Sequence, residues 1–499
     1  SSNIQGSRTS PNEKMTYGSV KGNVGLGVNL DINKNTSFEL TLNPDFSQVE
    51  ADVTQIDVNS SFSLQYPERR PFFNRGTDLV NFTDGAFYSR SIINPSIATK
   101  LISQGKKSRL FLLNALDKNS VYLVGGEDRS YSGQGGKSLV NVLRYQYLLS
   151  SKSRFGGVMM NRFYKGGGFG HVFGLDGLFL LNQNLRLSFE VFKNINEEPI
   201  KDWIETDATI NGKTIALDGD KINGDALYIQ LYRKTEHWKS YLFYRNISPQ
   251  YRSDVGFVVK NNRRWGTLFH EYINIINKPA VQSFGFGTKV DVVYTFEDLY
   301  KNLSIDLFAS LKTYGQTEIK YTLDYDAVKT FLGNRFNDLP THSLSISGSP
   351  SESFNFRMNL STGKDLSVNE DIPEVGRLKS SYLTVNFQVN DNLIINPSLR
   401  YSKLERLDRN ANYFEGSIAR LNIRYQFSNA FNIRLVSQKN TFTNQFFIQP
   451  LVQWNPNPST IFYFGGNQNT IEEIEGAHFQ LLQFNQTQFF FKFQYLIGL

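Results

Sequence analysis

The sequence predicts an all-β protein: a transmembrane antiparallel outer-membrane β-barrel of roughly 20–26 strands, with room for an in-folded lumenal segment. Three observations carry this prediction. Apolar and polar residues alternate over long segments, short turns alternate with long polar loops, and aromatic residues make up 14% of the chain. The aromatic residues include 41 Phe and 25 Tyr, which favour strands. A chain of 499 residues is long enough for one large barrel.

The strands are predicted from an apolar–polar period of two. Leu303, Ile305 and Leu307 alternate with Ser304 and Asp306. The same alternation recurs at residues 185–191, 354–360, 383–389, 421–427 and 489–495. Such segments have one apolar and one polar face, as a strand between lipid and a wet lumen requires.

The connections between these segments are of two kinds. Some are only a few residues long, such as Asn182–Asn184 and Asn390–Asn392. The long polar separators are Asn194–Gly224, Asp326–Thr341, Gly363–Arg377, Glu405–Tyr413 and Gly465–Gly476. Barrels of the outer membrane join their strands by short periplasmic turns and long outer loops, so this alternation supports the barrel. The sequence predicts no helical stretch, and only Asp326–Phe336 has room for one or two helical turns.

Composition excludes several other classes of protein. The absence of cysteine excludes disulfide scaffolds, thiolate zinc sites, iron–sulfur clusters and a cysteine nucleophile. The sequence contains no run of about 18 apolar residues, so it predicts no helical membrane span. The net charge of +7 comes from cations scattered singly along the chain, which argues against a nucleic-acid partner and suits anionic lipid headgroups or a polar pore lining.

A soluble β-propeller or a β-sandwich binder is the alternative architecture. Propeller blades would repeat about every 40–50 residues, and no such repeat is present. Charged residues also occur in the middle of long strands, whereas sandwich strands are usually about 5–6 residues long.

The domain division predicted is a polar linker over residues 1–20, continuing from an unseen N-terminal region, and a barrel over residues 21–499.

Two N-terminal blocks interrupt the alternation, Asn43–Asp52 and Tyr66–Phe73. The candidate site residues that they supply are Asp45, Glu50, Asp52, Glu68, Arg69 and Arg70. Carboxylates beside guanidinium groups form charge-assisted hydrogen-bond networks, so we expect a lumenal charge network that is structural or binds a ligand. Two carboxylates could instead serve as general acid and base. Asp218-Gly219-Asp220 is interpreted as an ordinary turn, with a weak calcium site as the alternative.

These blocks also carry a family resemblance. The stretches concerned are Asn43–Asp52, Pro67–Phe73, Tyr88–Arg90, Phe243–Phe257, Gln453–Thr460 and Phe491–Leu496. With them the chain resembles the C-terminal barrel of a Bacteroidota outer-membrane family of unknown function, whose N-terminal domain is similar to carbohydrate-binding module family nine. The resemblance implies the outer membrane of a Gram-negative bacterium and a glycan bound by that N-terminal domain.

A barrel this wide cannot be filled by side chains of its own wall, so it is plugged or it conducts. The plug candidate is Gly76–Asn94. The function predicted is a channel, or an anchor or accessory subunit of a larger complex for glycan uptake, protein secretion or barrel assembly. Expected partners are outer-membrane lipid, lipopolysaccharide and other outer-membrane or periplasmic proteins, with no cofactor or metal. The alternative is a membrane-associated hydrolase that uses lumenal carboxylates such as Asp45 and Glu68.

Overall fold

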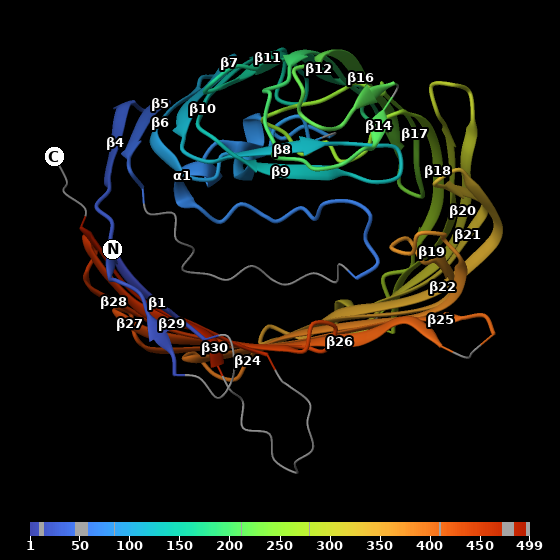
Figure 1. Ribbon diagram of the computed structural model, residues 1–499. Helices are drawn as coiled ribbons and strands as arrows, with labels where there is room; N and C mark the ends of the chain where they lie inside the picture. Colours follow the sequence, from blue (N-terminus) through green and yellow to red (C-terminus); the bar gives the residue numbers. More distant parts are fainter. Residues whose placement is uncertain are drawn as a thin grey trace.

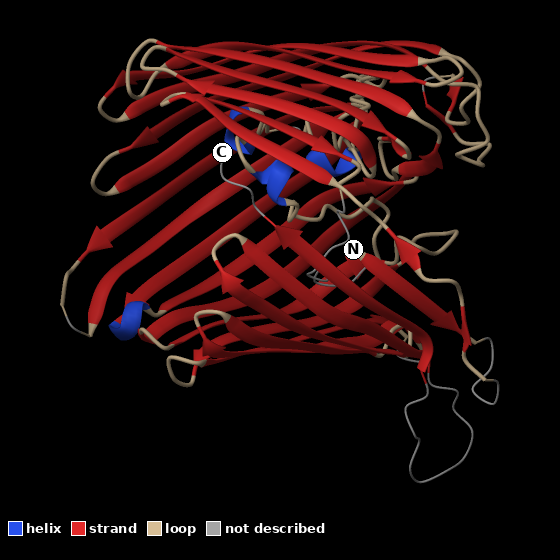
Figure 2. Ribbon diagram, turned by 90° about the vertical axis from the view of Figure 1, so that its left-hand side faces the viewer, coloured by secondary structure: helices blue, strands red, loops and turns tan. Residues whose placement is uncertain are grey.

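The computed structural model describes residues 1–8, 14–44, 58–83, 85–210, 212–278, 280–408, 411–471 and 484–495. Its main feature is one antiparallel sheet of 26 strand segments that curves into a ring (Figure 1). The strands run obliquely across the wall of this ring (Figure 2). The predicted all-β barrel and its strand number are therefore confirmed.

The strands of the ring follow one another around it almost in chain order. They are β1 (Ser2–Ser7), β2 (Thr16–Tyr17), β3 (Lys21–Gly22), β4 (Leu26–Asn33), β5 (Thr36–Leu42), β6 (Pro95–Gln104), β7 (Ser108–Asp117), β10 (Ser138–Leu148), β11 (Arg154–Tyr164), β12 (Phe169–Asn182), β13 (Leu185–Glu197), β16 (Lys221–Lys234), β17 (Trp238–Ile247), β18 (Arg263–Ile275), β19 (Val281–Tyr294), β20 (Tyr300–Thr313), β21 (Glu318–Phe331), β22 (Asn334–Ser351), β23 (Phe354–Leu366), β24 (Val375–Gln388), β25 (Leu393–Arg406), β26 (Asn412–Ser428), β27 (Phe431–Asn440), β28 (Gln445–Asn457), β29 (Thr460–Ile471) and β30 (Phe484–Tyr495).

The remaining elements are short. They are the hairpins β8 (Ser120–Val124) with β9 (Tyr131–Gly135) and β14 (Thr209–Ile210) with β15 (Lys213–Thr214), the α-helix α1 (Pro71–Asn74), and the 3₁₀ turns η1 (Thr77–Leu79), η2 (Ser89–Ser91) and η3 (Tyr314–Gln316). Among the described residues, no helix has the length and apolar character needed to span a membrane.

Each strand of the ring separates an outer from a lumenal face. In β10, Val140, Val142 and Arg144 are buried toward the lumen, whereas Leu143 and Tyr145 are exposed on the outer face. The outer faces of the other strands carry most of the exposed large apolar residues, Leu399 of β25 among them. An apolar outer band around a polar lumen is the arrangement of a transmembrane barrel, in which closure leaves no backbone group unpaired in lipid.

The N-terminal residues help to close the ring. Ser2–Ser7 form β1, which pairs with β30 on one side and with β2 and β3 on the other. After a break at residues 23–25, β4 pairs with β5. The expectation that residues 1–20 are only a linker is corrected here, because polar residues such as Asn3 and Gln5 are what a lumen-facing strand needs.

One predicted loop is also corrected. Residues 326–341 were expected to form a long polar loop with room for a helical turn or two, but most of them extend β21 and β22. The two strands are joined at Leu332 and Gly333, and both residues have positive φ, 49° and 75°. Apolar side chains explain this ordering, since Phe331, Leu339 and Leu366 form a small buried cluster.

The segment between β5 and β6 folds into the ring, and its described residues 58–83 and 85–94 are called the plug below. Figure 1 shows α1 of this plug inside the ring, near the hairpin of β8 and β9. Leu79, Val80 and Ile92 are buried in one cluster with wall residues such as Val142 and Met160. The predicted plug, Gly76–Asn94, therefore lies in the lumen, packed against the wall from β6 to β13.

Candidate functional site

An ion pair between Glu68 and Arg70 holds the plug in its fold. The guanidinium of Arg70 donates from Nε to Glu68 Oε1 at 2.8 Å and from Nη2 to Oε2 at 2.6 Å. It also donates to the carbonyl oxygens of Ile92 and Ser89 at 2.6 and 2.9 Å. Arg70 is 7% exposed, so this bidentate pair is buried, and Arg70 ties the Glu68–Arg70 block to residues 89–92 of the plug.

Both oxygens of the Glu68 carboxylate accept hydrogen bonds within the chain. Its Oε1 also accepts from the backbone N–H groups of Arg69 and Arg70, and its Oε2 accepts from the Ser89 hydroxyl at 2.6 Å. Burial alone would raise the pKa of Glu68, but the hydrogen bonds and charge of Arg70, with Ser89, outweigh it and lower the pKa below its ordinary value. A carboxylate held ionised with both oxygens engaged is suited to a structural role.

The loop between β17 and β18, residues 248–262, holds the other side of the plug and is called the central loop below. Its residues 251–256 are all buried. The backbone N–H of Tyr88 donates to the carbonyl of Val255 at 2.8 Å, and that of Phe257 donates to the carbonyl of Gly85 at 2.7 Å. A Cβ on Gly256 would approach the Gly85 oxygen to 2.5 Å, so this contact requires glycine. The plug is therefore clamped between the barrel wall and the central loop.

The wall contributes buried charges to the same assembly. Arg144 of β10 donates to both carboxylate oxygens of Asp176 of β12, at 2.5 and 2.8 Å, and to the carbonyl of Leu79 at 3.0 Å. Arg162 of β11 donates to the carbonyl of Ser91 at 2.9 Å. Through these guanidinium groups the barrel wall donates hydrogen bonds to backbone carbonyls of the plug. These carbonyls lie outside any strand and need such donors when they are buried.

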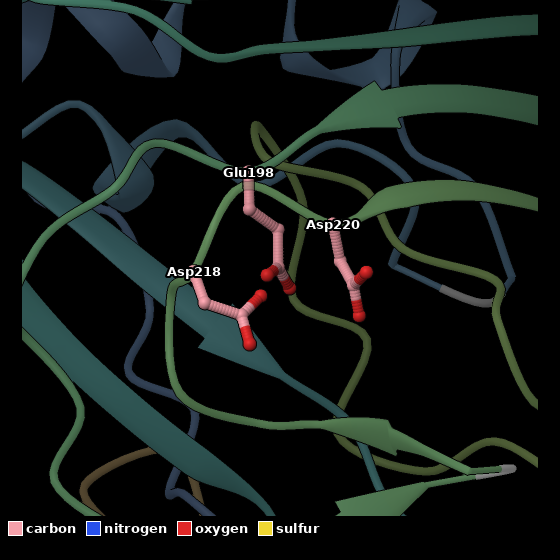
Figure 3. Close-up of side chains that lie close together, drawn as sticks. All are labelled: Glu198, Asp218 and Asp220. Atoms are coloured by element: carbon pink, nitrogen blue, oxygen red, sulfur yellow. The ribbon is translucent and has the colours of Figure 1, made fainter.

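Three carboxylates meet where the loop between β13 and β16 begins and ends. The ligand atoms of Glu198, Asp218 and Asp220 lie within 4.8 Å of one another, and Figure 3 shows the side chains converging. Arg252 of the central loop pairs with Glu198, and Lys213 pairs with Asp220 at 3.1 Å.

The carboxylates of this cluster have donors within the chain, while Glu198 Oε2 is buried without a hydrogen-bond partner among the described residues. Burial is the largest cause that raises the pKa of Glu198, and the neighbouring Asp218 and Asp220 raise it further, against the opposing effect of Arg252. Asp218 accepts from the Thr214 hydroxyl at 2.6 Å. Each carboxylate thus has a donor within the chain, which fits the interpretation of Asp218-Gly219-Asp220 as a turn. The proximity of Glu198 was not predicted.

The lumenal face of β25, β26 and β27 is basic. Arg400 of β25, Arg420 and Arg424 of β26 and Arg434 of β27 form a group called the arginine wall below. Together with Arg69 they line a cavity of about 270 Å³, and none of the described residues that line it is acidic. Arg69 and Arg70 are adjacent in the chain, yet Arg70 pins the plug while Arg69 reaches this cavity.

A second cavity lies beside β1 and β30. Its volume is about 710 Å³, and side-chain amides dominate its lining, among them Asn3, Gln5, Asn467 and Gln488. Lys21 also lines it. Amides both donate and accept hydrogen bonds, so this face of the lumen is polar and its described charges are positive.

The structure brings together two of the six residues of the predicted charge network. Glu68 and Arg70 form one tight pair, and Arg69 lies elsewhere. Asp45, Glu50 and Asp52 lie outside the described residues. Sequence reasoning missed the arginine wall, although the alternation placed Arg420, Asn422 and Arg424 on one polar face. It also missed Arg252, whose partner Glu198 lies far away in the chain.

Comparisons with known proteins give a family match over part of the chain. Residues 6–112 match a family described as a domain of unknown function, DUF5916. No curated protein sequence matches the chain.

Solved structures of a transporter and of receptors align with this chain at very low identity and with TM-scores below 0.5. The copper transporter OprC has a TM-score of 0.49 and 8% identity, covering 80% of this chain and 78% of its own. A mutant of the ferric enterobactin receptor of Pseudomonas aeruginosa has a TM-score of 0.44 and 8% identity, covering 79% and 76%. The ferric yersiniabactin uptake receptor FyuA from Yersinia pestis has a TM-score of 0.42 and 7% identity, covering 98% and 80%.

The strand pairing itself establishes the barrel. Large closed barrels with an apolar outer band and a polar lumen belong to the outer membrane of Gram-negative bacteria. The closed sheet and the exposed apolar outer residues therefore place this chain there.

Proposed function

We propose that this protein is an outer-membrane channel whose lumen is shared between a fixed plug and a polar passage along β24–β30 and β1. One observation carries the proposal: the apolar contacts of the plug are made with β6–β13 and the central loop, while two polar cavities line the opposite face. Barrels of about 22 strands are wide enough to hold a plug. This ring is of that size class, since its 26 strand segments include β2, β3 and β4, which follow one another along one stretch of chain.

The contacts of the plug support a passage beside it, without its release. Its anchoring pairs, Glu68 with Arg70 and Arg144 with Asp176, are buried. Breaking a buried pair by losing one partner costs about 3–5 kcal/mol. A solute that moved along the arginine wall and the amide-lined cavity would leave these pairs intact.

A hydrolase that uses Glu68 receives less support from the geometry. A general acid or base needs an oxygen that can reach the substrate proton. Both oxygens of Glu68 are occupied by Arg70, Ser89 and backbone N–H groups. The arrangement therefore favours a structural Glu68 over a catalytic one.

Membership of a larger complex stays a prediction. Lipid and lipopolysaccharide would surround the apolar outer face, and the family resemblance suggests glycan uptake, protein secretion or barrel assembly. Purification from native outer membranes in mild detergent, followed by mass spectrometry, tests this. A partner recovered in a fixed ratio would make the chain a subunit, whereas a lone barrel would support a self-contained channel.

The channel is tested by conductance in planar lipid bilayers, using a cysteine as a reporter. The natural chain has no cysteine, so Ser398→Cys introduces a single thiol in the cavity on the lumenal face of β25. We expect stepwise conductance that falls when a bulky maleimide is added. Leu399→Cys is the matched control, because Leu399 is exposed on the outer face. A protein that inserts without conducting, or equal block of both variants, would contradict the proposal.

A further inference from the structure

We infer that Glu198, Asp218 and Asp220 form a binding site for one calcium ion. Such a site lies apart from the passage proposed above and does not require conduction. Three features of the loop between β13 and β16 support it: the way its two ends are joined, a buried carboxylate oxygen that lacks a partner, and an excess of negative charge.

The two ends of this loop are joined by backbone hydrogen bonds. The N–H of Glu198 donates to the carbonyl of Asp220 at 3.0 Å, and the N–H of Lys201 donates to the carbonyl of Leu217 at 3.0 Å. Leu217 is also buried in an apolar cluster with residues of β8 and β11. The sequence alone offered two neighbouring carboxylates, and this pairing adds Glu198 from the other end of the loop. The three side chains therefore stand on a fixed backbone.

Glu198 has a buried carboxylate oxygen that the protein leaves unused. The side chain of Glu198 is 0% exposed, and its Oε1 pairs with Arg252. Its Oε2 is buried and has no hydrogen-bond partner among the described residues. Figure 3 shows this carboxylate turned toward Asp218 and Asp220. A buried carboxylate oxygen without a partner is costly, and coordination of a metal ion is one of the ways in which proteins satisfy it.

The cluster carries more negative than positive charge. Among its described ion pairs, Arg252 and Lys213 are the cations that face the three carboxylates. The ammonium of Lys213 lies 3.1 Å from Asp220 Oδ1 and donates to the carbonyl of Lys221 at 2.9 Å. Carboxylate and carbonyl oxygens are also the ligands of calcium. Lys213 is 29% exposed, so its ammonium can withdraw into solvent when an ion takes its place.

The donor set fits calcium in chemistry and in size. Carboxylate oxygens select a hard cation, and calcium binds them at about 2.3–2.6 Å. Ligands on opposite sides of one calcium ion are therefore about 5 Å apart. The three ligand atoms lie within 4.8 Å of one another, so one ion can contact all of them with small movements of the side chains.

The position of the cluster gives a calcium ion access from solvent. Its carboxylates range from the buried Glu198 through Asp220 to the exposed Asp218. The loop leaves β13 at the end opposite to the short turn that precedes this strand, and long loops of such barrels lie on the extracellular side. Calcium sites of extracellular proteins have dissociation constants of about 0.1–1 mM, which suits a site that a lysine partly fills.

The test is calorimetric titration with calcium chloride of the full barrel, refolded in detergent without lipopolysaccharide and freed of metal by a chelator. We expect one ion per barrel, with a dissociation constant of about 0.1–1 mM. Asp218→Asn should weaken binding at least tenfold, because it removes a charged ligand at an exposed position. Lys213→Gln should tighten binding several-fold, because the competing ammonium is gone.

Asp207→Asn is the matched control, since Asp207 is exposed in the same loop and lies outside the cluster. It should bind calcium as the natural protein does. Absence of saturable binding to the natural protein, or equal weakening by Asp218→Asn and Asp207→Asn, would overturn the inference. Should Asp218→Asn fail to fold, Lys213→Gln decides: tighter binding supports the site, and unchanged or weaker binding overturns it.

Discussion

Among single residues, the two arginines of the block Glu68-Arg69-Arg70 face different surroundings, the interior of the plug and the cavity of the arginine wall. Arg70 turns into the plug, where its guanidinium pairs with Glu68, donates to three backbone carbonyls and lies over the Phe73 ring, with Cζ 4.2 Å from the ring centroid. Arg69 lines the cavity of the arginine wall. The prolines at either end, Pro67 and Pro71, keep the block out of a strand ladder, so the two side chains are free to diverge.

Glu68→Gln is expected to destabilise the barrel by about 3–5 kcal/mol, because it leaves the buried charge of Arg70 without its partner. The pKa of Glu68 is lowered from 4.5, so the pair contributes fully above that value. Its contribution is lost as the pH falls through the lower folded value. Thermal unfolding measured by circular dichroism from pH 7 down to pH 3 should show this acid-sensitive step in the natural protein.

The variant should have a lower melting temperature at pH 7 and lack that step. Exposed Glu352, in the loop between β22 and β23, gives the control Glu352→Gln, which should behave as the natural protein. Unchanged stability of Glu68→Gln, or a hydrolytic activity that it abolishes, would contradict the structural role.

At the scale of elements, the ring depends on β1. This strand has only six residues, yet it pairs with β30 over its whole length and with β2 and β3 on its other edge. The last strand would otherwise present an unpaired edge in lipid, where unsatisfied backbone groups are costly. The polar N-terminal residues thus belong to the barrel wall.

A disulfide between β1 and β30 tests this closure. Ile4 lies opposite Phe489, so Ile4→Cys with Phe489→Cys should cross-link on oxidation, detected as a shift on a non-reducing gel. The control pairs Ile4→Cys with Gln488→Cys, whose side chain lies on the opposite face of the sheet. Equal cross-linking of both pairs would mean that residues 1–7 do not hold this register.

At the scale of the whole molecule, the lumen has two unlike halves. The half that holds the plug is sealed by apolar packing and by buried pairs such as Arg144 with Asp176. The half along β24–β30 and β1 is lined by amides and arginine. The docking of the plug therefore sets the width of the passage, and the arginine wall faces this passage.

Arg144→Met is expected to loosen the plug, because it leaves the buried Asp176 carboxylate without its partner and removes the donor to the Leu79 carbonyl. Conductance in bilayers should rise and become noisier, and proteases should cut within residues 58–94. Arg357→Met, at an exposed position of β23, is the control and should change neither reading. A protease-resistant plug in Arg144→Met would show that apolar packing alone holds it.

Much of the fold could be predicted because alternation is a local property. A period of two with apolar residues on one face specifies a strand between lipid and water wherever it occurs, as at residues 303–311. The plug was placed correctly for a related reason, since Pro67, Pro71 and the charges between them cannot form a strand of the wall. Residues 1–7 and 326–341 were mispredicted because their polar residues face the lumen, where a strand and a loop have similar composition.

The alternation of residues is enough to specify which side chains face lipid and which face the lumen, because side-chain direction in a strand follows from position alone. Which lumenal residues meet depends on how the whole chain folds. Arg252 pairs with Glu198, and Arg424 lies opposite Arg434, through strand register and loop folding. Register depends on the whole ring and on the turns between strands, and a local pattern does not contain it.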